Sequence, residues 1–269
     1  MPWGADRWGP AGVVAALLAG ALAGCGTSHS DGPSGHALAT AADNDNPPEA
    51  AEPTPDTGPN GGRGARAAAG PLFRAELPGL GPSTLAKVPS NARQVVLVTG
   101  EGRDSARSTA VLYERDATGA WRAGPAWTAH NALRGWTADH HLNDLRSPIG
   151  VFPLTDAGGY LPDPGSRLPY DRSGGFTIGG TGFAGEPLAG SFDYVVAINY
   201  NRVAGTSPLD WTRPMGANRG GGVWFHVDHG GPTRGCVTLA KDHMRALVRA
   251  LDPRLHPVVV MGDAGSLAE

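Results

Sequence analysis

The stretch GVWFHVDHGGPTRGCVTLAKDHMRALVRALDP, residues 222–253, decides the fold. Its first part, residues 222–227, is a compact run of β-branched and aromatic side chains, which predicts a strand. Its last part, residues 240–251, places apolar side chains at i, i+3, i+4 and i+7, which predicts an amphipathic helix. Pro253 ends that helix, because a residue before proline is pushed out of the helical region. A glycine-rich turn with Cys236 lies between the strand and the helix.

Short apolar runs broken by Gly, Pro and Asp surround this stretch and predict further strands. They cover residues 94–99, 108–114, 121–130, 149–154, 193–200 and 257–261. With a single clear helix among them, the predicted fold class is mostly β, a β-sandwich-like mixed sheet with one prominent α-helix directly after Cys236. The chain's 41 Gly and 24 Pro agree with a fold of short strands and many turns.

The N-terminal region predicts an exported chain. Residues 13–23 form an apolar run after Arg7 that is shorter than the roughly 20 residues of a membrane-spanning helix. Such a run is typical of a secretory signal peptide. It ends in Leu22-Ala23-Gly24-Cys25, which resembles a bacterial lipobox, so residues 1–24 are predicted to be removed and Cys25 to be lipidated. The alternative is an ordinary signal peptide, and both place the mature protein outside the cytoplasm.

The remaining chain divides by composition. Residues 25–70 have almost no bulky apolar side chains and predict a disordered tether, because such a segment cannot offset its ordering entropy. Residues 71–92 are predicted to connect the tether to the folded domain at 93–263, and residues 264–269 to form a tail. The net charge of -3 excludes a nucleic-acid partner held by a basic field.

Cys236 is the candidate nucleophile. The sequence has two cysteines, so a lipidated Cys25 leaves Cys236 without a disulfide partner in the chain. A free thiol outside the cytoplasm invites a functional explanation. A tight strand-to-helix turn exposes its side chain, and Gly235 beside it leaves room for a substrate. The alternative is a buried cysteine that acts only as a small apolar residue.

A nucleophilic thiol needs a base or a positive neighbour, because the thiolate is the reactive form. His226 ends the predicted strand and alternates with Trp224 on one face, opposite Phe225, so a rigid element would hold its imidazole. The alternative is a structural histidine. His229 lies in a glycine-flanked loop, which is typical of a solvated residue. Arg234 either contacts the thiolate or a substrate carboxylate, or faces water.

At these residues the chain resembles the catalytic domain of L,D-transpeptidases of the YkuD type. The matching pieces are Phe225-His226-Val227, then Thr233-Arg234-Gly235-Cys236-Val237 and the following helix. Ser147-Pro148-Ile149-Gly150-Val151-Phe152 resembles the Thr-Pro-x-Gly-x-Phe strand that opens many of these domains, and the resemblance covers roughly residues 93–262. The chain departs from the family pattern at Arg234, where the family has His, at Thr238, where Asn is common, and in its short His-to-Cys loop.

The resemblance implies a cysteine acyltransferase of peptidoglycan biosynthesis with a role in cell shape. His226 would take the proton of Cys236 or hold it as an ion pair, and the thiolate would attack the third residue of a tetrapeptide stem and release D-Ala. The carbonyl of Val227 is expected to orient His226, with Asp228 as the weaker candidate.

The resemblance also implies the surroundings of the nucleophile. Backbone N–H groups of Gly235 and Cys236 would stabilise the oxyanion. Thr233, Arg234 and His229 would bind substrate. No metal or organic cofactor is needed. The implied partners are peptidoglycan stem peptides, the membrane through the lipid anchor, and carbapenem-type inhibitors that acylate the thiol.

Several alternatives stay open at this point. A second stem as acceptor gives a cross-link between third-position residues, whereas water makes the enzyme an L,D-carboxypeptidase. A non-catalytic wall-binding lipoprotein could use the same fold. A metal-dependent hydrolase would draw its ligands from His226, Asp228, His229, Cys236, His140 and His141, although this spacing lacks the helical i, i+4 pair of zincins.

Aromatic residues and glycine-rich loops are further candidates for a substrate groove. Core packing is the expectation for Tyr194, Tyr200 and Trp224, which lie in strand-like runs, while Tyr170 and Trp211 could line a groove. The glycine-rich segments 174–185 and 205–222 are either lids over a site or plain surface loops.

Overall fold

The computed structural model describes residues 73–269. The predicted signal peptide at 1–24, the lipidation of Cys25 and the tether at 25–70 lie outside the described residues and stay predictions. Across residues 73–269, the helices are too short or too polar to cross a membrane.

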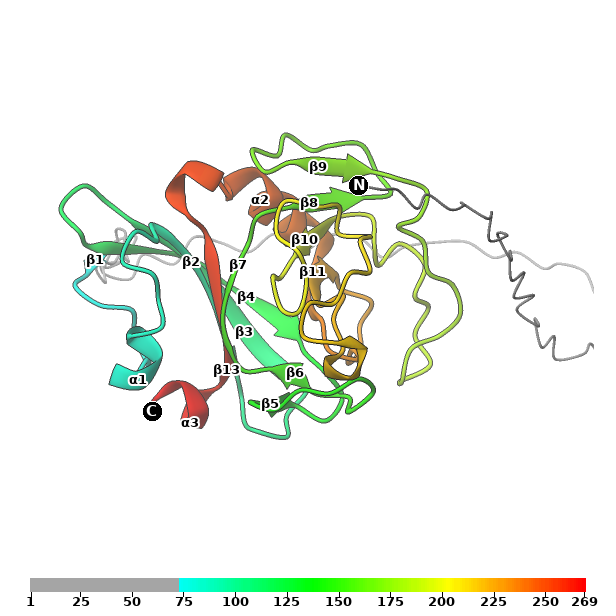
Figure 1. Cartoon of the computed structure of the whole chain (residues 1–269), viewed down its shortest axis with the longest axis horizontal. Helices are drawn as coiled ribbons and strands as arrows, with labels where there is room; N and C mark the ends of the chain where they lie inside the picture. The colour runs from blue at the N-terminus through cyan, green and yellow to red at the C-terminus, as the bar shows by residue number, and fades with distance from the viewer. Residues whose placement is uncertain (1–72) are drawn as a thin grey trace, which may run out of the picture. The chain divides into compact units, whose positions relative to one another are not determined.

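A curled mixed sheet of 11 strands forms the framework of the described chain (Figure 1). Its order is β7-β13-β2-β3-β4-β12-β11-β10-β8-β9, and β1 pairs with β4. The strands are β1 (Phe73–Arg74), β2 (Gln94–Gly100), β3 (Arg107–Arg115), β4 (Trp121–His130), β7 (Gly150–Pro153), β8 (Ala157–Gly159), β9 (Tyr170–Arg172), β10 (Val195–Ala197), β11 (Trp224–Val227), β12 (Val237–Leu239) and β13 (Val258–Asp263). Strands β5 (Trp136–Thr137) and β6 (Ser147–Pro148) form a separate parallel pair. The mostly β fold class is thereby confirmed.

Each of the seven predicted strands is present, although β10 is shorter than its run of sequence. Strand β10 ends at Ala197. The Ile198 amide then donates to the Val223 carbonyl, and Asn201 adopts a left-handed φ of 45°. Strands β8, β9 and β12 were not predicted, since each has three residues and no apolar run of its own. Strand β12 nevertheless follows Cys236 directly and connects two longer strands of the sheet. It pairs in parallel with β11 and in antiparallel with β4.

Strands β2 and β13 lie side by side in parallel, with Val95 opposite Val258. Both faces of this pair are covered. Val96 and Val259 belong to the main core, whereas Val95 and Val258 belong to a second apolar cluster on the opposite face. Burial on both faces explains why these strands read as continuous apolar runs.

Helix α2 (Lys241–Ala250) confirms the predicted helix and packs on the main core. Its apolar stripe, Met244, Leu247 and Val248, is fully buried, as is Leu251 at its C-cap. Asp242 lies in the first turn, where the helix dipole favours an acid. Asp252 then caps the short 3-10 helix η2 (Pro253–Leu255) by accepting from the Arg254 amide.

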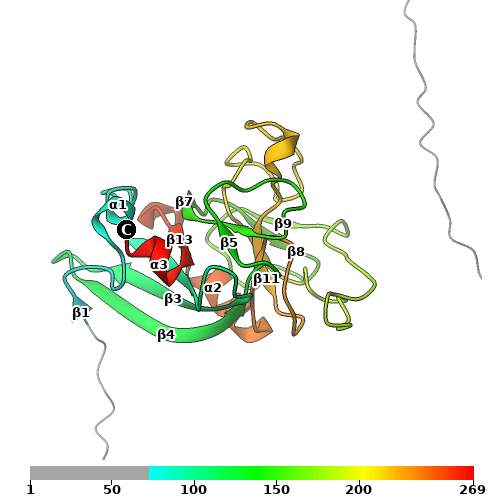
Figure 2. The same ribbon diagram turned by 90° about the horizontal axis from the view of Figure 1, so that it is seen from below.

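The two ends of the described chain pack on each other, as Figures 1 and 2 show. Helix α1 (Pro82–Leu85) belongs to the predicted connecting segment, and α3 (Ala264–Leu267) belongs to the predicted tail. The Gly81 amide donates to the Leu267 carbonyl at 2.9 Å, and the Ser83 amide to the Glu269 carbonyl at 2.9 Å. Leu267 is buried in the second apolar cluster, so the C-terminal residues form part of the packed fold.

Candidate functional site

The turn that carries Cys236 is braced by two hydroxyl groups. Thr233 Oγ1 donates to the Cys236 carbonyl at 2.6 Å and accepts from the Gly235 amide at 3.2 Å. Ser147, fully buried at the start of β6, donates from Oγ to the Gly235 carbonyl at 2.9 Å and accepts from the Ala132 amide at 3.1 Å. The turn therefore keeps a fixed shape, and the hydroxyl of Thr233 is engaged in that shape. Its predicted contact with substrate stays a prediction.

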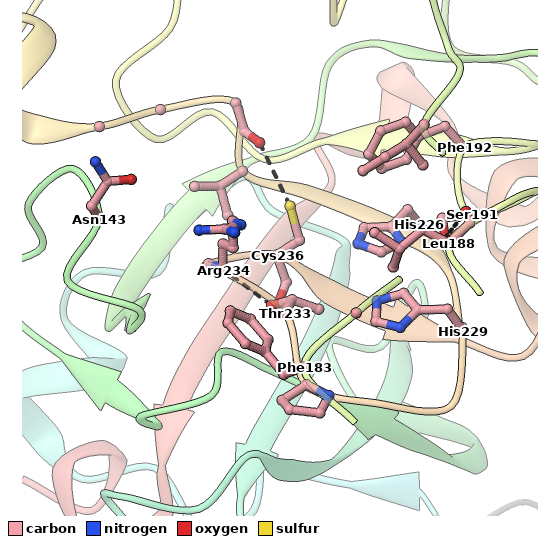
Figure 3. A pocket seen from close by; sticks show the side chains of 18 of the residues that line it. Asn143, Phe183, Leu188, Ser191, Phe192, His226, His229, Thr233, Arg234 and Cys236 are labelled. Atoms are coloured by element: carbon pink, nitrogen blue, oxygen red, sulfur yellow. Dashed lines mark hydrogen bonds between the residues drawn. The ribbon is translucent and has the colours of Figure 1, made fainter. Parts of the chain in front are cut away.

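The thiol of Cys236 lies between two backbone groups. The Trp224 amide donates to Sγ at 3.4 Å, and Sγ donates to the Gly222 carbonyl at 3.6 Å, the bond drawn from the sulfur in Figure 3. The cysteine is partly exposed and lines a pocket, while the protein around its sulfur removes most of the solvation of a thiolate. This loss of solvation raises the pKa of the Cys236 thiol to about 11, and the bond from the Trp224 amide opposes the rise only weakly.

His226 lies on β11 and is 4% exposed. Its Nδ1 faces the Val227 carbonyl at 3.0 Å. A carbonyl can only accept, so Nδ1 carries the proton and Nε2 is left as the basic nitrogen. The predicted orientation of His226 by a backbone carbonyl is confirmed. Asp228, the weaker candidate, instead accepts from Thr238 Oγ1 at 2.6 Å and pairs with His130 at 2.8 Å.

Burial lowers the pKa of His226 to about 4. The bond to the Val227 carbonyl opposes this shift, the nearby His229 reinforces it, and the Asp228 charge and the Ser191 carbonyl oppose it. Because the pKa of the thiol is about 11 and that of the imidazole about 4, both groups are neutral at pH values between these two. A resting thiolate–imidazolium pair, one of the two expectations for these residues, is therefore disfavoured.

The sheet register places the two groups on one face. Phe225 is opposite Val237 in the parallel β11–β12 pair, so one step back Trp224 aligns with Cys236. His226 follows Trp224 by two residues and shares its face. Among residues 73–269, however, no hydrogen bond joins Sγ to the imidazole, because the thiol is turned to Gly222. Transfer of the Cys236 proton to His226 stays a prediction.

His229 is not the solvated loop residue that its glycine-rich surroundings favoured. Its side chain is 6% exposed, and Nδ1 donates to Glu186 Oε1 at 3.0 Å. Its ring lies nearly parallel to that of His226, with centroids 5.8 Å apart and an interplanar angle of 16° (Figure 3). Phe192 meets His226 edge to face at 5.3 Å. The imidazole of His226 is thus held between two rings.

A pocket of about 530 Å³ opens over the thiol. The predicted site residues Thr233, Arg234, Gly235, Cys236, His226 and His229 all line it. The rest of the lining is largely apolar, and Trp211 at its rim is 74% exposed, whereas Tyr194, Tyr200 and Trp224 are buried as expected. Arg234 is exposed and lies over the Phe183 ring at 5.3 Å.

One predicted oxyanion donor is occupied. The Gly235 amide already donates to Thr233 Oγ1, so it has no free hydrogen for an oxyanion. Of the predicted pair, the Cys236 amide is the remaining candidate.

Sequence reasoning missed several residues that shape this site. Ser147 braces the turn, Gly222 holds the thiol, and Glu186 pairs with His229. These contacts span 88, 14 and 43 positions of sequence, and only the first lies in a segment that the resemblance had singled out. Gly222 follows two other glycines with positive φ, and its own φ is +67°, which turns its carbonyl in a way that favours glycine.

The residues considered as metal ligands have other partners. His140 lies 3.0 Å from Asp144, and His141 lies 3.2 Å from Asp139. In the described part of the chain, no group of three or more His, Cys, Asp or Glu side chains is arranged to hold a metal ion.

Comparisons with known proteins place the chain in no family. No protein-family model matches it, and no curated protein matches it significantly. Among solved structures, the helical cell shape determining protein Pgp2 from Campylobacter jejuni matches 64% of this chain and 48% of its own, with 18% identity and a TM-score of 0.36. The matched part is less than half of that protein, and a likeness at this level carries no argument about fold or activity. The resemblance to L,D-transpeptidases stays a prediction.

Proposed function

We propose that this protein is an L,D-transpeptidase that works outside the cytoplasm of a bacterium, anchored to the membrane by a lipid on Cys25. One observation carries the proposal. A cysteine on a braced turn opens into a pocket on the same sheet face as a buried histidine whose Nε2 is unprotonated. Nucleophile, base and a carbonyl that orients the base are the parts of a thiol acyltransferase.

The resting thiol is neutral and bonded to Gly222, so the first step must move it. Sγ would have to leave the Gly222 carbonyl and approach Nε2 of His226. Hydrogen bonds of catalytic groups are often long or absent before substrate binds, so this rearrangement is compatible with catalysis. Binding of substrate in the pocket, with displacement of water, would supply the free energy for this movement of Sγ.

His226 Nε2 takes the thiol proton while Sγ attacks the carbonyl carbon of the third residue of a tetrapeptide stem. The Cys236 amide donates to the oxyanion, and a donor of this kind contributes about 2.7–4 kcal/mol to transition-state stabilisation. The C–N bond breaks, D-Ala leaves with the proton from His226, and a thioester remains. An amine of a neighbouring stem attacks it, the C–S bond breaks, and the proton that the amine loses passes through His226 to Sγ, which restores the thiol.

The pocket's charges support a substrate with a carboxylate. Its lining contains the positive charge of Arg234 and no Asp or Glu, while burial keeps His226 neutral. Within residues 73–269, no salt bridge engages the Arg234 guanidinium, so it is available to an anion entering the pocket. Stem peptides carry several carboxylates. Water as acceptor would make the enzyme an L,D-carboxypeptidase, and the same site would serve both reactions.

A non-catalytic wall-binding lipoprotein is the second candidate. The bond from Sγ to Gly222 and the high pKa of the thiol favour it, because both disfavour a ready nucleophile. The two candidates share the pocket and differ only in whether Cys236 forms a covalent adduct.

Product analysis with a defined tetrapeptide stem tests the proposal. The full chain should release D-Ala and form either a cross-linked dimer or a tripeptide, and Cys236→Ser should abolish both. Added chelator should leave the rate unchanged, because a loss would favour a metal-dependent hydrolase. A carbapenem should block the reaction by acylating the thiol. No D-Ala release over a range of stems would reject the enzymatic proposal in favour of wall binding.

A further inference from the structure

Residues 181–187, which begin in the glycine-rich segment 174–185, form a small closed hairpin that lines the pocket. Thr181 pairs with Pro187, and the Gly182 amide donates to the Glu186 carbonyl at 2.8 Å. The Ala184 amide donates to Glu186 Oε2 at 2.8 Å, so the carboxylate closes its own turn. Phe183 lies at the tip and is 41% exposed. This hairpin, residues 181–187, is therefore an ordered element and not an open loop.

Glu186 attaches the hairpin to the loop after β11. Its Oε1 lies 3.0 Å from His229 Nδ1, and the two side chains are 11% and 6% exposed. The backbone leaves room for this carboxylate at two glycines. A Cβ atom at Gly182 or at Gly231 would lie 2.1 Å from Oε1. The two glycines therefore leave space for the carboxylate in its present position, where it pairs with the buried side chain of His229.

A second contact joins the hairpin to the residues just before Cys236. Arg234, two residues before the thiol, lies over the Phe183 ring at 5.3 Å. The hairpin thus contacts the chain between β11 and Cys236 at two residues. Glu186 pairs with His229, and Phe183 lies against Arg234 (Figure 3 shows Phe183, Arg234 and His229).

Through His229, Glu186 also affects the position of His226, the proposed base. The imidazoles of His229 and His226 are stacked, and Phe192 closes the opposite side of His226. Glu186 fixes the ring of His229 through Nδ1, and the fixed ring limits how His226 can tilt. A base must be held within a narrow range of geometry to act on its proton, so a displacement of this stack would reach the reacting atoms.

We propose that Glu186 is a positioning residue that ties the hairpin 181–187 over Cys236 and, through His229, holds His226 in its working orientation. The positioning of His226 rests on the proposed function, whereas the covering of Cys236 does not. Nothing in the sequence around Glu186 indicates this role, because it lies among glycines 43 positions before its partner.

Variants of the full chain separate the two parts of the proposal, each in a Cys25→Ser background so that Cys236 is the sole thiol. Glu186→Ala removes the tie. His229→Asn keeps a donor near the position of Nδ1 for Glu186 but removes the stacked ring. Glu101→Ala is the matched control, since Glu101 forms an exposed ion pair with Arg107 that lies outside the pocket lining.

Alkylation of Cys236 by iodoacetamide reports whether the pocket is covered, without any need for turnover. We expect Glu186→Ala to react about 5-fold or more faster at pH 8, because local opening admits water and reagent. His229→Asn and Glu101→Ala should stay within about twofold of the parent. Equal rates in Glu186→Ala and the parent would overturn the covering role.

Acyl transfer from a tetrapeptide stem reports positioning. We expect kcat to fall about 10-fold or more in both Glu186→Ala and His229→Asn, with a rise in KM confined to Glu186→Ala. Glu186→Gln, which keeps one acceptor oxygen, should recover part of kcat. An unchanged kcat in Glu186→Ala would overturn the positioning role. If the parent itself shows no acyl transfer, the proposed function fails, while the alkylation rates still decide whether Glu186 covers Cys236.

Discussion

The pH dependence of Cys236 alkylation follows directly from the surroundings of the sulfur. A free thiol has a pKa of about 8.5, so about a quarter of it is thiolate at pH 8. Loss of solvation raises the pKa of Cys236 to about 11. At pH 8 only about one thousandth of it is then ionised, a fraction about 240-fold smaller.

Part of the lost alkylation rate is recovered because a thiolate whose conjugate thiol has a higher pKa is the stronger nucleophile. With a Brønsted slope of about 0.4–0.5, the gain is about 13-fold, which leaves alkylation about 20-fold slower than that of a free thiol. Restricted entry to the pocket would slow it further. The rate should keep rising with pH up to and beyond pH 10, since the titration midpoint lies near 11.

Mass spectrometry of iodoacetamide adducts between pH 5 and 11, in the Cys25→Ser chain, measures this profile. The same chain unfolded in urea provides the control, because its Cys236 should react at the ordinary rate. A plateau of fast alkylation between pH 5 and 8 would refute the reasoning. Such a plateau is the signature of a thiolate–imidazolium pair with His226.

Three further predictions concern stability. Leu247→Ala removes a fully buried side chain of α2 from the main core, and we expect urea unfolding to show a loss of about 2–5 kcal/mol. Asp156→Ala leaves Arg202, whose side chain is 2% exposed, without its carboxylate, and this should cost about 3–5 kcal/mol in the same assay; a loss below 1 kcal/mol would contradict it. The low pKa of His226, about 4 when folded against about 6.5 when unfolded, means that the unfolded chain binds the extra proton between these values. Stability should therefore fall by about 3 kcal/mol as pH drops from 6.5 to 4, and His226→Gln should lack this part of the loss.

The long apolar runs of this fold could be predicted because their physics is local. The β2 and β13 strands are buried on both faces and read as uninterrupted Val-rich segments, and α2 shows its buried stripe at helical spacing. Strand β12 could not be found this way. Its three residues depend on pairing with β11 and β4 for their extended shape, and no local pattern encodes that pairing.

The site likewise contains some features that a single residue type indicates and others that depend on contacts between distant segments. Cys236 and His226 could be proposed as candidates because a lone thiol and a strand histidine carry their chemistry in their residue type. The orientation of the thiol toward Gly222, the bracing by Ser147 and the pairing of His229 with Glu186 all depend on contacts between distant segments. His229 shows the consequence most clearly. Its glycine neighbours favoured a solvated residue, and the carboxylate that buries it lies in another loop.

The most direct test of the central claim is the intact mass of the full Cys25→Ser chain after incubation with a tetrapeptide stem, followed by peptide mapping. A covalent acyl adduct on Cys236, equal to the stem without its terminal D-Ala, is the predicted result, and it should be absent from Cys236→Ser. An unmodified chain, under conditions in which iodoacetamide still labels Cys236, would contradict the claim that this thiol is a catalytic nucleophile.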